Sequence, residues 1–102
     1  QWLTTNQTIL SDLATIPRER WCAIEYDNFI ANTPEELRRL CEFAQLIFGP
    51  RMVSVASRPL RPSKYTLTPP DPNKWKKNAD DLAPFIGQTD GLMQELRALT
   101  RQ

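Results

Sequence analysis

The stretch WCAIEYDNFIANTPEELRRLCEFA, residues 21–44, decides which fold class this sequence predicts. Its first six residues, Trp21–Tyr26, are rich in residue types that favour β-structure, so they predict a strand. Thr33, Pro34 and Glu36 then match a capping box, in which threonine accepts a backbone N–H, proline opens the helix and glutamate reaches back to the cap. A strand followed by a capped helix indicates an α/β layer structure.

Helices are predicted on both sides of the strand. The capped helix carries an apolar stripe from Leu37 to Ile47 and ends at Gly49-Pro50. Further helices are predicted over residues 2–14, about 51–57, about 78–86 and, after a break at Gly87, about 90–101. A lone strand cannot satisfy its own backbone groups. We therefore expect its sheet to lie in sequence outside these residues, or its partner to be the same strand of a second copy.

The chain length and the composition, with 40% hydrophobic and 25% charged residues, predict one globular domain over residues 1–102. No apolar run approaches the roughly 20 residues that cross a bilayer, and no signal-peptide pattern opens the chain. Because the chain starts at Gln1 without methionine, we expect a piece of a longer protein. Cys22 and Cys41 lie in apolar patterns and predict buried thiols in a reducing cytosol. Histidine, the commonest general base and metal ligand, is absent, and no metal site is predicted.

The basic residues gather in one tract. From Arg58 to Lys77 there are six basic residues against one acid, Asp71, while the remainder is acidic. The tract holds five prolines and no glycine from Arg58 to Pro72, so an extended, stiff backbone is expected. It ends in the loop TLTPPDPNKWKKN, residues 66–78, which is either a solvated connector or a clamp for an anion and something flat. One basic tract on an acidic body favours a local anion site over a nucleic-acid surface or a membrane.

Five motifs in order give the chain a family resemblance. They are the helix with IL-x-DL, the basic turn and strand, Tyr-Asp-Asn-Phe at residues 26–29, the Thr-Pro-capped helix with RRLCEFA, and the proline-rich loop before KWKKN. This order resembles the C-terminal part of the sulfotransferases that use 3′-phosphoadenosine-5′-phosphosulfate (PAPS), above all the bacterial type. The resemblance implies a P-loop-like domain with a parallel sheet, mostly helical in this segment, and sulfuryl transfer to a hydroxyl or amine.

The resemblance also implies binding roles for individual residues. Tyr26 matches the tyrosine near the adenine of the cofactor. Trp75 and Lys76 match the loop that closes over the nucleotide and contacts its 3′-phosphate, with Lys74 and Asn78 beside them. Two departures affect these roles: the loop has prolines where the family often has glycines, and residues 26–29 stand where Tyr-Glu-Asp-Leu is usual.

The family's phosphate loop and general base precede the matched segment, so no catalytic residue is assigned here. We expect the segment to be inactive alone and to need the N-terminal part of the same domain, because sulfuryl transfer requires both charge stabilisation and a base. A different class stays open: the chain is a helical, non-catalytic interaction module in which residues 58–72 dock as a proline-rich ligand or the helices bind a partner. Trp75 could equally anchor its loop to the body of the protein, and Tyr26 could be a core residue.

Overall fold

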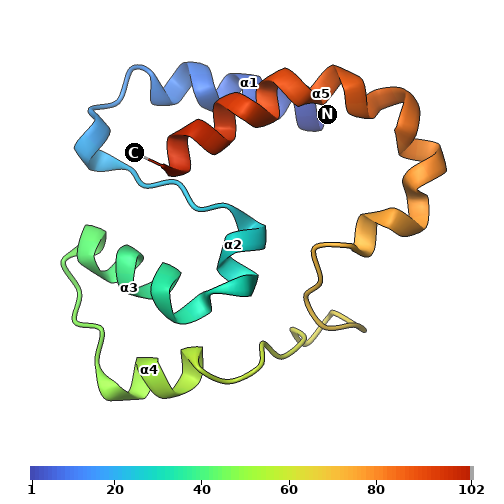
Figure 1. Ribbon diagram of the computed structural model, residues 1–102. Coiled ribbons are helices and arrows are strands. Elements are labelled where there is room, and N and C mark those ends of the chain that lie inside the picture. The colour runs from blue at the N-terminus through green and yellow to red at the C-terminus, as the bar shows by residue number, and fades with distance from the viewer. Residues whose placement is uncertain (102) are drawn as a thin grey trace. The chain divides into compact units, whose positions relative to one another are not determined.

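The computed structural model describes residues 1–101, which form helices joined by irregular segments (Figure 1). This part of the chain divides into two compact units. Unit 1 contains residues 1–23 together with the chain from Trp75 onward, and unit 2 contains Ile24–Lys74. Each unit has its own helix–helix seam.

The predicted α/β class and its parallel sheet are wrong, because residues 1–101 contain helices and no strand. Residues 21–25 do have extended backbone, with φ −146° and ψ 156° at Trp21 and φ −83° and ψ 128° at Glu25. A strand also needs a neighbouring strand with which to exchange hydrogen bonds, and the described residues supply none. Tyr26, predicted to end the strand, instead begins helix α2. The described chain is therefore all-helical.

Unit 1 is built on helices α1 (Trp2–Leu13) and α5 (Ala79–Thr100), which contact each other and lie side by side in Figure 1. Leu92 of α5 is buried. A hollow of about 350 Å³ along the seam is lined by Leu3, Gln7 and Leu10 of α1 and by the Gln88, Gly91, Leu92 and Glu95 side of α5. Leu3 and Leu10 are half-buried, whereas Trp2 and Ile9 are 45% and 43% exposed.

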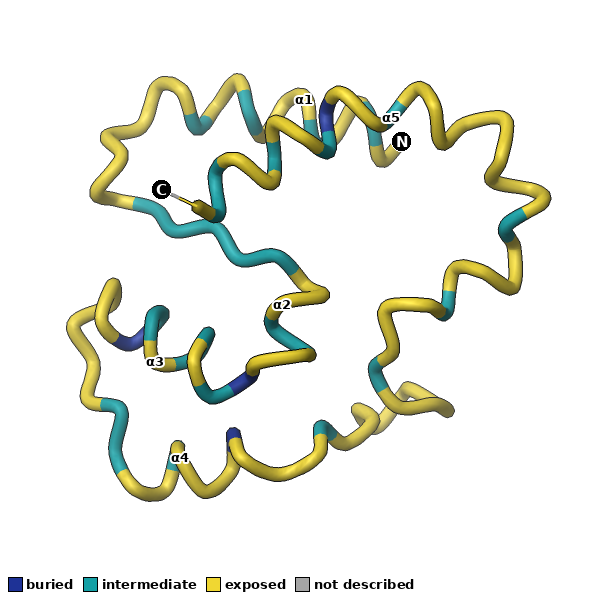
Figure 2. Tube along the Cα trace, in the orientation of Figure 1, coloured by how far each residue is buried: buried dark blue, intermediate teal, exposed yellow. Residues whose placement is uncertain are grey.

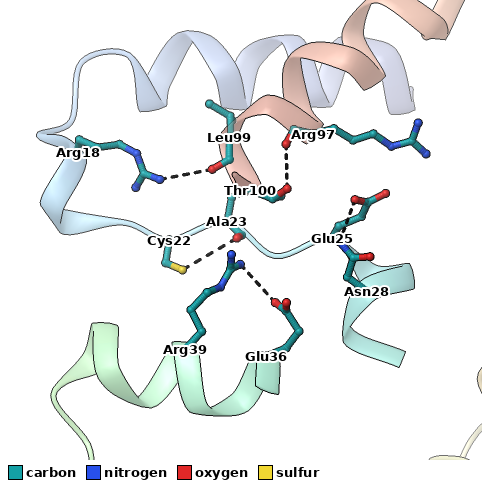
Figure 3. Close-up of polar contacts among 10 residues, drawn as sticks. All are labelled: Arg18, Cys22, Ala23, Glu25, Asn28, Glu36, Arg39, Arg97, Leu99 and Thr100. Carbon is teal, nitrogen blue, oxygen red and sulfur yellow. Dashed lines mark hydrogen bonds and ion pairs between the residues drawn. The ribbon is translucent and has the colours of Figure 1, made fainter. Parts of the chain in front are cut away.

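The turn after α1 is held to the end of α5. A short 3₁₀ helix, η1 (Arg18–Arg20), positions the Arg18 guanidinium 4.0 Å from the Trp21 ring centroid. The same guanidinium donates to the Trp21 carbonyl at 2.7 Å and to the Leu99 carbonyl at 3.4 Å (Figure 3). A cation at the carbonyl end of a helix is favourable because the helix dipole is negative there. Arg18 thus fastens the turn to α5.

Helix α5 runs unbroken for 22 residues, so the predicted break at Gly87 is wrong. Glycine costs a helix only about 1 kcal/mol relative to alanine, which neighbouring good helix formers offset. Pro84 lies inside the helix. Its ring removes an N–H and crowds the carbonyl one turn earlier, which bends helices. The first turns of α5 are set at an angle to the remainder (Figure 1).

Unit 2 contains three short helices: α2 (Tyr26–Ala31), α3 (Thr33–Ala44) and α4 (Pro50–Ala56). Helix α3 contacts both of the others. Cys41 of α3 is buried and its thiol donates to Met52 Sδ of α4 at 3.3 Å, while Cys22 is only half-buried. Gln45 ends α3 with φ 57° and ψ 37°, a left-handed conformation that glycine usually provides.

The predicted capping box is also wrong. The Thr33 hydroxyl, instead of accepting an N–H, donates to the Phe29 carbonyl at 2.8 Å and so joins α3 to α2. Glu36 pairs with Arg39 at 3.3 Å (Figure 3) instead of reaching back to the cap. Asn32 stands before the helix without a side-chain cap bond. Because α2 ends where α3 begins, the carbonyls of α2 compete for the hydroxyl that a free cap would use.

Burial is shallow throughout the described residues, and exposed positions dominate Figure 2. The buried apolar residues are Cys41, Ala56 and Leu92, and no side chain falls below 2% exposure. Large apolar side chains remain open to solvent, including Ile47 at 89% and Leu67 at 100%. None of the described helices combines the length and the apolar character that spanning a membrane requires.

Candidate functional site

The segment KWKKN, predicted as a loop, is a single short 3₁₀ helix, η2 (Lys74–Asn78), that leads directly into α5. A 3₁₀ helix has about three residues per turn, so side chains at i and i+3 share a side. Trp75 and Asn78 therefore leave η2 on one side, and Lys76 leaves it on another.

The turn before η2 belongs to unit 2 and is braced by polar contacts. The Asp71 carboxylate accepts the Asn73 backbone N–H at 2.8 Å, which is an Asx turn. Lys74 donates from Nζ to the Thr68 carbonyl at 3.1 Å and is half-buried. Lys74, one of the predicted nucleotide ligands, therefore uses its ammonium group to stabilise its own loop.

Trp75 lies on the wall of an apolar groove within unit 1. The groove has a volume of about 800 Å³, and its walls include Trp2, Trp75, Leu82, Phe85, Ile86 and Met93. Trp75 is 45% exposed and Phe85 is 59% exposed. Volumes of about 300–1,000 Å³ with aromatic walls are typical of ligand pockets. The indole thus lines the groove and remains partly open to a ligand.

The charges around η2 separate into two groups. Lys76 and Lys77 are exposed at its end, and Asp80 and Asp81 occupy the first turn of α5. The two carboxylates already complement the positive end of the helix dipole. An anion at this place is therefore attracted by the lysine side chains and not by the helix end itself.

Tyr26, the predicted adenine contact, lies in unit 2 and is 59% exposed. It occupies the first turn of α2, where the neighbouring Asn28 amide donates to the Glu25 carboxylate at 3.3 Å (Figure 3). It is not a core residue of unit 2, because its ring is open to solvent. Lys74 belongs to the same unit as Tyr26, whereas residues 75–78 belong to unit 1.

The groove itself was missed at the level of sequence. Leu82, Phe85, Ile86 and Met93 recur at helical spacing, which is a readable signal. The assumed break at Gly87 divided that signal between two shorter helices. Trp2 of α1 lines the same groove.

No protein-family model matches this chain, and comparison with characterised proteins and with solved structures gives no match. Within residues 1–101, His, Cys, Asp and Glu side chains form no group of three that could hold a metal ion.

Proposed function

We propose that this chain is the C-terminal part of a cytoplasmic PAPS-dependent sulfotransferase and supplies the segment that closes over the nucleotide. The observation that carries the proposal is η2, in which an exposed lysine pair and a half-exposed tryptophan stand on one short, internally bonded turn. The order of the sequence motifs in residues 2–78 supports the same assignment, although residues 21–25 are extended without forming a strand.

In this proposal the 3′-phosphate of the nucleotide binds Lys76. The ammonium group supplies a point charge with several donors, and the phosphate oxygens accept them. Trp75, on a neighbouring side of the turn, packs against ribose or base. Lys74 braces the loop through Thr68 and so acts on the nucleotide indirectly.

The reaction breaks the sulfur–oxygen bond of the phosphosulfate and forms a new sulfur–oxygen or sulfur–nitrogen bond to the acceptor. The nucleotide 3′,5′-bisphosphate leaves with the bonding electron pair, and the acceptor proton goes to a base. That base and the groups that hold the 5′-phosphosulfate lie outside these 102 residues. This chain contributes binding and closure, because chemistry of this kind depends on positioning and charge stabilisation.

The experiment is a calorimetric titration of the complete protein with 3′-phosphoadenosine-5′-phosphate and, separately, with adenosine-5′-phosphate. A charge-assisted hydrogen bond contributes roughly 1.5–3 kcal/mol, so Lys76→Ala should weaken the first nucleotide about ten- to a hundredfold. The affinity for adenosine-5′-phosphate should stay nearly unchanged, since this nucleotide has no 3′-phosphate for Lys76 to bind.

Two matched controls distinguish a direct contact between Lys76 and the 3′-phosphate from the general electrostatic attraction of the basic residues. Lys77→Ala removes the same charge one position along η2, and Lys64→Ala removes it from an exposed position of unit 2. Both should leave the affinities within about twofold, because exposed charges are screened by salt. Equal losses for both nucleotides with Lys76→Ala would overturn the assigned contact.

A further inference from the structure

The stretch RPLRPSK, residues 58–64, is the most exposed basic segment of unit 2. It follows α4, and residues 59–63 belong to no helix or strand. All of its residues are exposed except Leu60, which is half-buried. Arg58 donates to Ser54 Oγ of α4 at 3.1 Å, so the start of the stretch is fixed to a helix.

The two prolines restrict the backbone of this stretch strongly. Each proline holds φ near −65°, and each residue before a proline is kept out of the helical region. Arg58-Pro59 and Arg61-Pro62 are therefore both biased to the polyproline II conformation, which turns once in about three residues. Pro59 and Pro62 then share one edge, and Arg58 and Arg61 share another. A turn from Ser63 to Thr66, with a backbone bond of 3.0 Å, ends the extended run.

The positive charges of residues 58–64 have no acidic residues near them in the sequence. No acidic residue occurs between residues 43 and 70. Lys64 lies over the Tyr65 ring, with Nζ 5.5 Å from the centroid. A narrow line of cations beside a proline edge complements a groove that has aromatic walls and carboxylates at one end.

We propose that residues 58–64 form a docking segment for a protein domain that binds polyproline II helices in an aromatic-lined groove flanked by carboxylates. Domains of the SH3 type use this mode, in which prolines spaced i and i+3 fill aromatic pockets and a cation pairs with acidic residues. The prolines lower the entropy lost on binding, because the segment is already extended. This proposal involves no residue of η2, and it is independent of the nucleotide site.

The chain contains its own matched control. PPDP, residues 69–72, repeats the spacing with Pro69 and Pro72 but carries Asp71 in place of the cations. Asp71 is also held in the Asx turn with Asn73. An acidic groove should therefore select residues 58–64 and reject residues 69–72.

The experiment titrates the whole chain with a purified SH3 domain that has an acidic patch, and with the same domain after its carboxylates are changed to amides. Loss of a central contact commonly costs more than 1 kcal/mol, so Pro62→Ala should weaken binding about tenfold. Arg61→Ala should weaken it several-fold, and less at high salt. Pro72→Ala should have no effect, and circular dichroism confirms equal helix content in each variant.

The result that supports the proposal is saturable binding that depends on Pro62 and Arg61 and on the acidic patch of the domain. Absence of binding at millimolar domain would overturn it. Equal losses for Pro62→Ala and Pro72→Ala would overturn it as well, because the segment would then bind without regard to its basic edge.

Discussion

Two basic stretches of this chain, residues 58–64 and residues 74–78, are both rich in cations and close to prolines, yet their backbones are ordered in different ways. The first belongs to no helix or strand over residues 59–63, and Pro59 and Pro62 bias it to an extended backbone. The second is a 3₁₀ helix that continues into α5 and follows an Asx-braced turn. Charge alone therefore does not define a site. The extended segment at residues 58–64 fits a groove in another protein. The helical turn at residues 74–78 fits a contact between one lysine and one anionic group.

The largest expected effect comes from disrupting the seam between α1 and α5, in the unit that contains residues 75–78. Leu92→Ala removes the buried leucine between α1 and α5, and truncation of a buried leucine costs about 2–5 kcal/mol. We expect hydrogen exchange to accelerate across α1 and α5, while α3 and α4 keep their protection. Leu67→Ala, at a fully exposed leucine, is the matched control and should change neither. Equal acceleration in both units would show that they unfold together.

Pro84→Ala tests whether the bend in α5 sets the position of η2. Proline inside a helix is about 3 kcal/mol less favourable than alanine, so we expect a stability gain of about 1–3 kcal/mol in chemical denaturation. Straightening should also change the walls of the groove at Leu82 and Phe85, and with them the tryptophan fluorescence. A variant with unchanged stability and fluorescence would mean that another residue causes the bend.

Asp71→Ala removes the Asx turn that precedes η2. The loss of one exposed side-chain-to-backbone bond to a charged acceptor should cost about 1 kcal/mol locally. We expect amide chemical shifts to change from Asn73 to Asn78 and to stay constant at residues 58–64. Asp71→Asn, which keeps the acceptor oxygen, should restore most of the shifts. Changes confined to residue 71 itself would contradict a bracing role.

Gln45→Gly tests the unit that contains residues 58–64, since α3 and α4 belong to that unit. Gln45 is the one non-glycine residue in residues 1–101 with positive φ. The left-handed conformation costs a residue with a side chain about 1 kcal/mol, so glycine should stabilise unit 2 by about that amount. Exchange of α3 amides should slow, and exchange of α5 amides should not. Faster exchange in α3 would contradict the cap assignment.

The sequence allowed the helices to be predicted better than their ends. Residues 33–44 and 50–56 are helical as their apolar spacing indicates, but the first helix ends at Ala44 and not at the predicted Gly49-Pro50. The strand prediction at Trp21–Tyr26 was wrong because β-favouring residues encode an extended backbone, while a strand also needs a partner. The break at Gly87 was wrong because glycine was weighed more heavily than the long apolar spacing around it.

The candidate site was predicted in part. The position and composition of the KWKKN segment were readable, whereas its 3₁₀ geometry and the engagement of Lys74 with Thr68 depend on how the turn folds. The groove beside Trp75 joins Trp2 to residues about 70–90 positions later in the sequence. Contacts of that separation come from the packing of α1 on α5, which local patterns do not encode.

The most direct test of the proposed function is nucleotide selectivity in the complete, unmodified protein. Calorimetry at millimolar nucleotide would compare 3′-phosphoadenosine-5′-phosphate with adenosine-5′-phosphate. The account predicts that the first binds at least about tenfold more tightly, because only its 3′-phosphate forms a charge-assisted bond with Lys76. No binding of either nucleotide, or equal affinity for both, would contradict the assignment of this chain to a PAPS-dependent sulfotransferase.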